Sequence, residues 1–186
     1  MKKKIYYTLV ILVLIYGGFS LYYRPYTIAD NKMQLEESVV KIINRPVVIT
    51  DKVEIKQELN LHNKKFVLFS YGNKLANVEL IKGINKKYKI EGVELNDNYF
   101  QDDIRTTSDG KYLILVGKNY NSKIAYVRVL LDSNEYKINI PQQEYFITYC
   151  KVPMETERTF IGVGNLKIYN SQDVDITEEM NKILFK

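Results

Sequence analysis

A chain of 186 residues that is 46% hydrophobic and 26% charged, with only 4 prolines, has the composition of one ordered globular domain. The formal net charge of +5 does not indicate a nucleic-acid-binding protein, because the lysines at positions 2–4 leave 24 basic against 22 acidic side chains in residues 24–186. A single cysteine excludes an intramolecular disulfide, and with a single histidine it cannot supply the four ligands of a structural zinc site, so neither a metal nor another cofactor is expected.

Residues 5–23 form an uncharged, mostly apolar run between the three lysines and Arg24. As a helix, its 19 residues extend about 28 Å, close to the ~30 Å hydrocarbon core of a bilayer. The lysines favour retention of residues 1–4 in the cytoplasm, so the rest of the chain is expected beyond the membrane. The sequence therefore predicts a single-pass protein of the cell membrane, with residues 5–23 as a transmembrane signal-anchor and an extracytoplasmic, extracellular domain.

Two pairs of tyrosines mark the ends of this run. Tyr6 and Tyr7 stand at its start and Tyr22 and Tyr23 at its end, the spacing expected of aromatic side chains at the two membrane interfaces. Because a discarded peptide has no need of the second pair, the tyrosines favour a permanent anchor. The alternative is a signal peptide that is cleaved after residue 20 or residue 29, where small residues precede the cut, and that leaves a secreted protein.

Residues 24–46 contain the stretch ADNKMQLEESVVKIINRP, which predicts a short juxtamembrane amphipathic helix. Asn31 followed by Gln34 is a capping box at its start, and Pro46 ends it. Its apolar stripe consists of Met33, Leu35, Val39, Val40, Ile42 and Ile43. Such a helix packs on the domain or stands as a stalk; the alternative is a helix that lies on the membrane or binds a partner.

Residues 47–186 are predicted to form a β-rich extracytoplasmic domain. Apolar and polar residues alternate over Val53–Leu61 and over Tyr136–Ile140, the pattern of strands with one buried face. By contrast, Phe66–Phe69 and Tyr112–Val116 are apolar at every position, which predicts central strands that are buried on both faces.

Short turn signals separate these strands at intervals near ten residues. Examples are Gly72-Asn73, Asn96-Asp97, Asp109-Gly110 and Ser133-Asn134. Because short connections join antiparallel neighbours, the sequence predicts a mainly β fold, an antiparallel β-sandwich or partly closed barrel of about seven to ten strands. A last short helix is expected over Thr177–Leu184, with Asp175 and Glu178 as its capping box.

The chemically reactive side chains fit structural roles better than catalytic ones. His62 lies among turn residues, and Cys150 lies inside a predicted strand as a small apolar residue. Gly162 and Gly164 form a G-x-G pair without the third glycine and the following helix that a phosphate-binding loop requires. The sequence therefore does not indicate a catalytic site in which a serine or cysteine nucleophile uses a histidine as its base.

Carboxylates form two dense groups in the sequence. Glycoside hydrolysis therefore stays open as a reaction, because it needs only two acidic side chains that flank the bond. Asp102 and Asp103 are neighbours on a predicted strand, so they are expected to point to opposite faces rather than to converge. The second group, which helix capping and solvation explain, consists of Asp173, Asp175, Glu178 and Glu179. It lacks the glycine of a calcium-binding loop.

Tyrosine is abundant, with 16 residues in all and 11 beyond residue 23. Most of them suit the faces of strands. Exposed aromatic side chains in loops can also stack on sugars or anchor a protein partner. The candidates for such a recognition surface are Tyr99, Phe100 and Tyr120.

The expected function is a binding or accessory module, without catalysis, of the bacterial cell envelope. Its partner is an envelope protein or a cell-wall polymer, and the oligomeric state stays open. The first alternative is a secreted or anchored hydrolase of cell-wall carbohydrate that uses paired carboxylates. The second is a structural subunit of an envelope complex.

Overall fold

The computed structural model of the protein describes residues 2–45, 47, 49–50, 52–95, 98–162 and 164–185, with side chains from residue 6 onward. The helices are α1 (Lys2–Tyr23), α2 (Lys32–Ile43), the 3₁₀ turn η1 (Tyr120–Ser122) and α3 (Thr177–Leu184). The strands are β1 (Glu54–Leu61), β2 (Lys64–Tyr71), β3 (Lys74–Lys82), β4 (Tyr88–Leu95), β5 (Phe100–Thr107), β6 (Gly110–Lys118), β7 (Tyr126–Leu131), β8 (Asn134–Asn139), β9 (Tyr145–Val152) and β10 (Leu166–Tyr169). The predicted mainly β fold with a helix at each end of the domain is confirmed.

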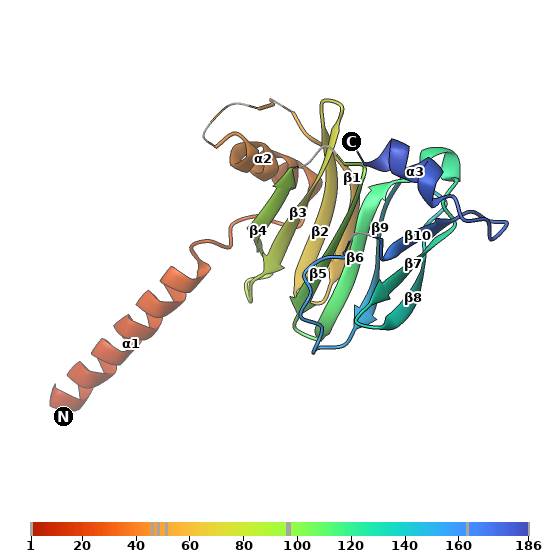
Figure 1. Ribbon diagram of the computed structural model, residues 1–186. Coiled ribbons are helices and arrows are strands. Elements are labelled where there is room, and N and C mark those ends of the chain that lie inside the picture. The colour runs from red at the N-terminus through yellow and green to blue at the C-terminus, as the bar shows by residue number, and fades with distance from the viewer. Residues whose placement is uncertain are drawn as a thin grey trace.

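The ten described strands form three open antiparallel sheets. Sheet A has the order β1-β2-β3-β4, sheet B the order β5-β6-β9 and sheet C the order β10-β7-β8. The sheets stack face to face, with α2 on the outer face of sheet A and α3 at one end of sheets B and C (Figure 1). The sandwich therefore has three β-layers, one more than a simple sandwich.

Each pair of layers encloses a separate apolar core. Phe66 and Leu68 of β2 point toward sheet B, whereas Val67 and Phe69 point toward α2, so β2 is buried on both faces as predicted. The cluster between sheets B and C includes Leu113 and Leu115 of β6 and the buried face of α3. The apolar runs of β2 and β6 thus place both strands in the middle of their sheets.

Helix α2 packs on sheet A through Leu35, Val39 and Ile43, which are 4% exposed or less. The side chain of Asn31 accepts a hydrogen bond from the backbone N–H of Gln34, as the capping box predicts. Gln34 does not return the bond to Asn31 but accepts one from the backbone N–H of Ala29. The helix is therefore held to the segment that precedes it.

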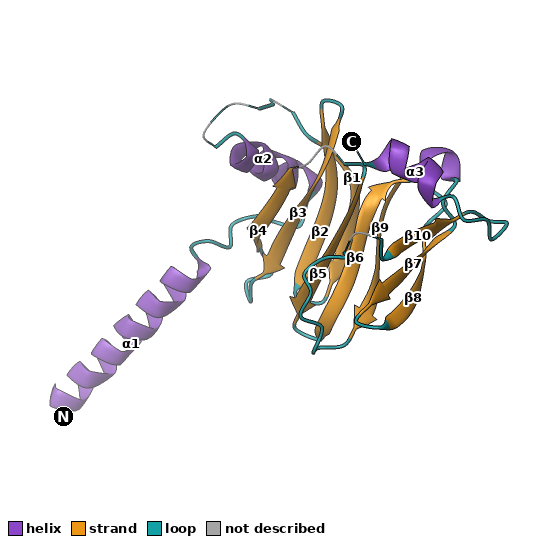
Figure 2. Ribbon diagram, in the orientation of Figure 1, coloured by secondary structure: helices purple, strands orange, loops and turns teal. Residues whose placement is uncertain are grey.

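Helix α1 is long and apolar enough to span a membrane. Its Tyr6–Tyr23 stretch is uncharged and none of it is buried inside the structure, and the helix points away from the sheets (Figure 2). The four tyrosines predicted to lie at the membrane interfaces are at its two ends, where Tyr6 is 66% and Tyr22 is 45% exposed. An apolar helix that packs on nothing in its own chain needs a bilayer or another partner to cover it.

The segment after α1 is docked on sheet A and does not form a free stalk. Ile28 pairs with Tyr88 at the start of β4 through two backbone hydrogen bonds of 3.0 and 2.8 Å. Asp30 forms an ion pair with Lys65, whose side chain is 3% exposed and lies 2.7 Å from Glu58. Burial favours the neutral amine, yet the hydrogen bonds to both carboxylates raise the pKa of Lys65, so it stays charged. These contacts hold the end of α1 at a fixed edge of the domain.

Most predicted boundaries agree with the structure. The last helix has the predicted bounds, but the predicted capping box is wrong, because the N-cap residue is Ile176 and no side chain caps the helix. Asp175 instead accepts hydrogen bonds from the backbone N–H and the hydroxyl of Thr177. The turn at Asn96-Asp97, Pro46 and Val163 lie outside the described residues, and α2 ends at Ile43.

Candidate functional site

A groove lined by described residues lies between α3 and the segment that joins β9 to β10, with a volume of about 1380 Å³. We call it the α3 groove. Its apolar lining residues are Ile161, Leu166, Val174, Ile176, Ile183 and Phe185. Its charged lining residues are Asp102, Lys167, Asp175, Glu178, Glu179 and Lys182. A large groove that combines apolar walls with a few charged groups is the usual form of a ligand site.

The position of α3 follows from its amphipathic sequence. Met180 and Leu184 are fully buried in the core between sheets B and C. The start of the helix is tied to β10, because Ile168 accepts a backbone hydrogen bond from Ile176 and donates one to the Thr177 hydroxyl, both 2.9 Å long. The outer side of α3 and its C-terminal Phe185, which is 37% exposed, are left to line the groove.

Asp102 is the least solvated carboxylate of the α3 groove. Burial raises its pKa above the ordinary aspartate value, and a hydrogen bond from the backbone N–H of Ile161 opposes that rise. By contrast, hydrogen bonds from Thr177 lower the pKa of Asp175 in the same groove. Groups in one groove whose pKa values shift in opposite directions are typical of functional sites.

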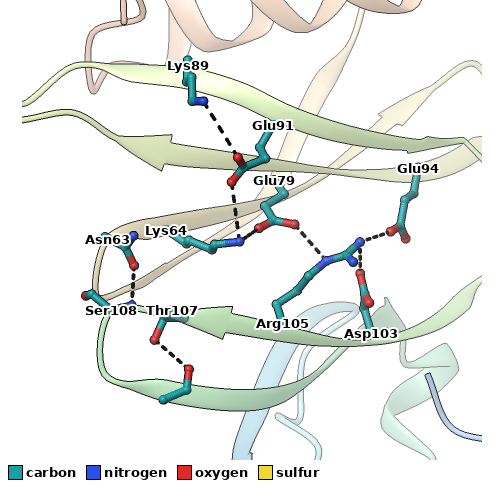
Figure 3. A network of polar contacts seen from close by, with 11 residues as sticks. Asn63, Lys64, Glu79, Lys89, Glu91, Glu94, Asp103, Arg105, Thr107 and Ser108 are labelled. Atoms are coloured by element: carbon teal, nitrogen blue, oxygen red, sulfur yellow. Dashed lines mark hydrogen bonds and ion pairs between the residues drawn. The ribbon is translucent and has the colours of Figure 1, made fainter. Parts of the chain in front are cut away.

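A second polar cluster, which we call the charged seam, lies between sheets A and B (Figure 3). It consists of Lys64, Glu79, Glu91, Glu94, Asp103 and Arg105. The guanidinium of Arg105 contacts three carboxylates: Glu94 at 2.7 Å, Glu79 at 2.9 Å and Asp103. Lys64 pairs with Glu79 and lies 3.5 Å from Glu91. The seam joins β2, β3 and β4 of sheet A to β5 of sheet B.

Carboxylates outnumber cations in the seam, and this changes the protonation of Asp103. Burial raises the pKa of Asp103 to about 7; the charge of Arg105 opposes this rise, and the neighbouring Glu94 and Glu79 add to it. Arg105 is shared with both glutamates, so its charge is already balanced. Asp103 is therefore partly protonated near neutral pH.

The seam has little free space beside it. The cavity lined by Asn77, Glu79, Glu94 and Asp103 has a volume of about 10 Å³, room for about one water molecule. Asp102 and Asp103 point to opposite faces of β5, as predicted, one toward Ile161 and the other toward Arg105. The contacts of the seam accordingly connect two sheets, and the α3 groove is the better candidate site.

The predicted aromatic recognition residues do not form one exposed surface. Phe100 is 1% exposed in the core between sheets B and C, which corrects the expectation that it is accessible. Tyr99 and Tyr120 are partly buried beside that core, with ring centroids 5.7 Å apart. The Tyr99 hydroxyl donates a hydrogen bond to the backbone carbonyl of Asn73, 3.1 Å away, and so connects sheet B to a turn of sheet A.

The histidine and the cysteine lie apart. His62 occupies a turn with φ of 56°, and its Nε2 atom is 3.0 Å from the hydroxyl of Tyr112 and 3.3 Å from Asp109. Cys150 packs on the core between sheets B and C, and burial raises the pKa of its thiol to about 11. In the described part of the chain, no three His, Cys, Asp or Glu side chains are grouped as metal ligands.

Sequence reasoning missed the α3 groove. A weak signal was present, because Val174 and Phe185, which line the groove, interrupt polar stretches near the C-terminus and remain exposed in the structure. Comparison of the chain with protein-family models, with curated proteins and with solved structures finds no match.

Proposed function

We propose that this chain is a single-pass membrane protein whose extracytoplasmic β domain acts as a non-catalytic binding or accessory module of the bacterial cell envelope. The observation that carries the proposal is α1, a helix of membrane-spanning length with none of its apolar surface buried. The lysines that precede the apolar run favour a cytoplasmic N-terminus, and the tyrosine pairs suit two membrane interfaces.

The docked segment after α1 supports retention of the anchor. Tyr26 and Ile28 are 9% and 8% exposed, and Ile28 forms part of the ladder at β4. Cleavage after Ala29 would remove both residues from the folded domain. Cleavage after Ser20 would remove most of α1 and leave Tyr22 and Tyr23 with no membrane to face.

We expect the protein to stay in the membrane fraction after alkaline carbonate extraction, since a spanning helix is held by its apolar surface and not by charge. A variant with Leu12→Lys and Ile15→Lys should move to the soluble fraction, because two charges at the centre of α1 oppose insertion. Intact-mass measurement of the wild type should give all 186 residues. A mature protein that lacks residues 1–20 or 1–29 would contradict retention.

We place the ligand of the module in the α3 groove. A photo-crosslinking residue at Asn181, which lines the groove, is expected to capture an envelope protein or cell-wall polymer in cells. Ile183→Glu in the same chain should reduce this capture several-fold, because it puts a charge among the apolar lining residues. The matched control is a crosslinker at Leu130, on the outer face of sheet C.

Equal capture from Asn181 and Leu130, or capture that Ile183→Glu does not change, would remove the groove as the binding site. Release of soluble fragments from cell-wall material by the purified protein, lost in Asp102→Asn, would replace binding with hydrolysis as the function. That outcome is the specific test of the non-catalytic proposal, since Asp102 is the buried carboxylate of the groove.

A further inference from the structure

We propose that the loop between β3 and β4, residues 83–87, is a second membrane contact that binds anionic lipid headgroups and inserts Ile84 at their level. This inference rests on the proposed membrane anchor. It adds to that anchor a site for lipid on the β domain itself. Four observations carry it: the position of the loop, its rigidity, its exposed isoleucine and its lysines.

The position of the loop follows from the chain itself. Tyr26 lies three residues beyond the end of α1, so at most about 10 Å of chain separates it from the membrane-facing Tyr23. Asn85 donates a hydrogen bond of 3.1 Å from its side chain to the backbone carbonyl of Tyr26. Each headgroup region is about 5–8 Å deep, so this bond holds the loop beside the headgroups that surround the end of α1.

The loop is rigid and fits closely on the segment that leaves the membrane. Gly83 and Lys87 are joined by a backbone hydrogen bond of 2.8 Å, and Asn85 accepts one from the N–H of Lys87. A Cβ atom on Gly83 would lie only 2.7 Å from the ring of Tyr26, so the close approach requires glycine. The loop therefore cannot move away from the exit point of α1 without breaking these contacts.

The tip of the loop presents an apolar side chain to solvent. Ile84 is 76% exposed, the highest value among the large hydrophobic residues described after α1. Nothing in the described domain covers it. At the headgroup boundary, such a side chain gains an apolar environment without any change in the fold.

Lysines surround this isoleucine. Lys82, Lys86 and Lys87 are exposed, and within the described residues Lys86 and Lys87 form no ion pair with a carboxylate. Lys89, on the next strand, lies with its ammonium 5.5 Å from the ring centroid of Tyr26 and 3.9 Å from Glu91, so the charge of the loop comes chiefly from the three exposed lysines. An exposed apolar residue among several cations is complementary to an anionic lipid surface, and it distinguishes this loop from the nearly neutral domain as a whole.

The test uses tryptophan fluorescence, because the chain contains no tryptophan of its own. Full-length Ile84→Trp protein is reconstituted in vesicles of phosphatidylcholine, alone or mixed with phosphatidylglycerol, with and without lipids brominated near the headgroup. In the anionic vesicles we expect a blue-shifted emission and quenching by the brominated lipid. Lys86→Gln with Lys87→Gln in the same chain should reduce the quenching to the level seen in neutral vesicles.

Leu130→Trp is the matched control. Leu130 is also an exposed apolar residue, at 49%, but it lies on β7, on the opposite side of the domain from α1 (Figure 1). Its emission should be the same with and without brominated lipid. Equal behaviour of the two probes in every vesicle would overturn the loop contact.

Flotation of the same samples in high salt shows whether α1 anchors the protein in the vesicles, and so tests the anchor separately from the loop contact. Protein that floats with its vesicles while the probe at position 84 stays unquenched keeps the anchor and overturns the loop contact. Protein that fails to float overturns both. Quenching at position 84 that is independent of lipid charge would overturn the role of the lysines.

Discussion

Arg105→Met is expected to lower the free energy of unfolding by about 2–4 kcal/mol at pH 8, because it leaves Glu79, Glu94 and Asp103 together without their shared cation. Breaking a fully buried ion pair typically costs about 3–5 kcal/mol, and the smaller value reflects the 33% exposure of the Arg105 side chain. The measurement is urea unfolding in detergent, followed by tyrosine fluorescence.

The loss is expected to be smaller at pH 5. In the wild type the pKa of Asp103 is raised from 3.8 to about 7, so between these values the folded state binds more protons than the unfolded state. Stability from this group is therefore present below pH 4 and is lost as the pH rises to about 7. Removing the guanidinium raises this pKa further, so the variant loses more stability at pH 8 than at pH 5.

The control for Arg105→Met replaces carboxylate partners of Arg105 with neutral side chains. Adding Glu79→Gln and Asp103→Asn to Arg105→Met should restore much of the lost stability at pH 8, because two of the three uncompensated charges are then gone. If Arg105→Met unfolds at the wild-type urea midpoint at pH 8, the charged seam does not stabilise the packing of sheet A on sheet B.

Phe100→Ala is expected to cost about 3–5 kcal/mol of unfolding free energy, the range for truncating a buried phenylalanine. Its ring lies 6.0 Å from those of Phe146 and Phe185, in the core that joins sheets B and C. The matched control is Phe160→Ala, since Phe160 is 62% exposed and its loss should change stability by only about 0.5 kcal/mol. A loss at Phe100 no larger than at Phe160 would contradict the core assignment.

Periodicity predicted the strands well, because burial on one or two faces leaves a direct mark on the sequence. The continuous apolar run Phe66–Phe69 identified the centre of sheet A, and the bounds of α3 were predicted although Asp175 is not its N-cap residue. The alternation rule also predicted that Asp102 and Asp103 diverge. These features could be predicted because they depend on residues that are close to one another in the sequence.

The candidate sites could not be predicted, because they depend on contacts between residues that are far apart in the sequence. Phe100 begins a strand directly after turn residues, so its position alone does not distinguish an exposed loop residue from a core residue. The charged seam joins β3 and β4 to β5 across two sheets, and no local pattern pairs Arg105 with Glu79. The α3 groove likewise forms only where the C-terminal helix meets β10.

In the topology proposed above, the pairing of β9 with β6 determines the order in which the layers are completed during export. Sheet A is a simple meander that has all four of its strands once residue 95 has emerged on the far side of the membrane in that proposed topology. Sheet B must wait for β9, because β7 and β8 intervene in the chain between its second and third strands. As translocation proceeds from the N-terminus, the layer docked to the anchor can fold first and serve as the template on which the later layers assemble.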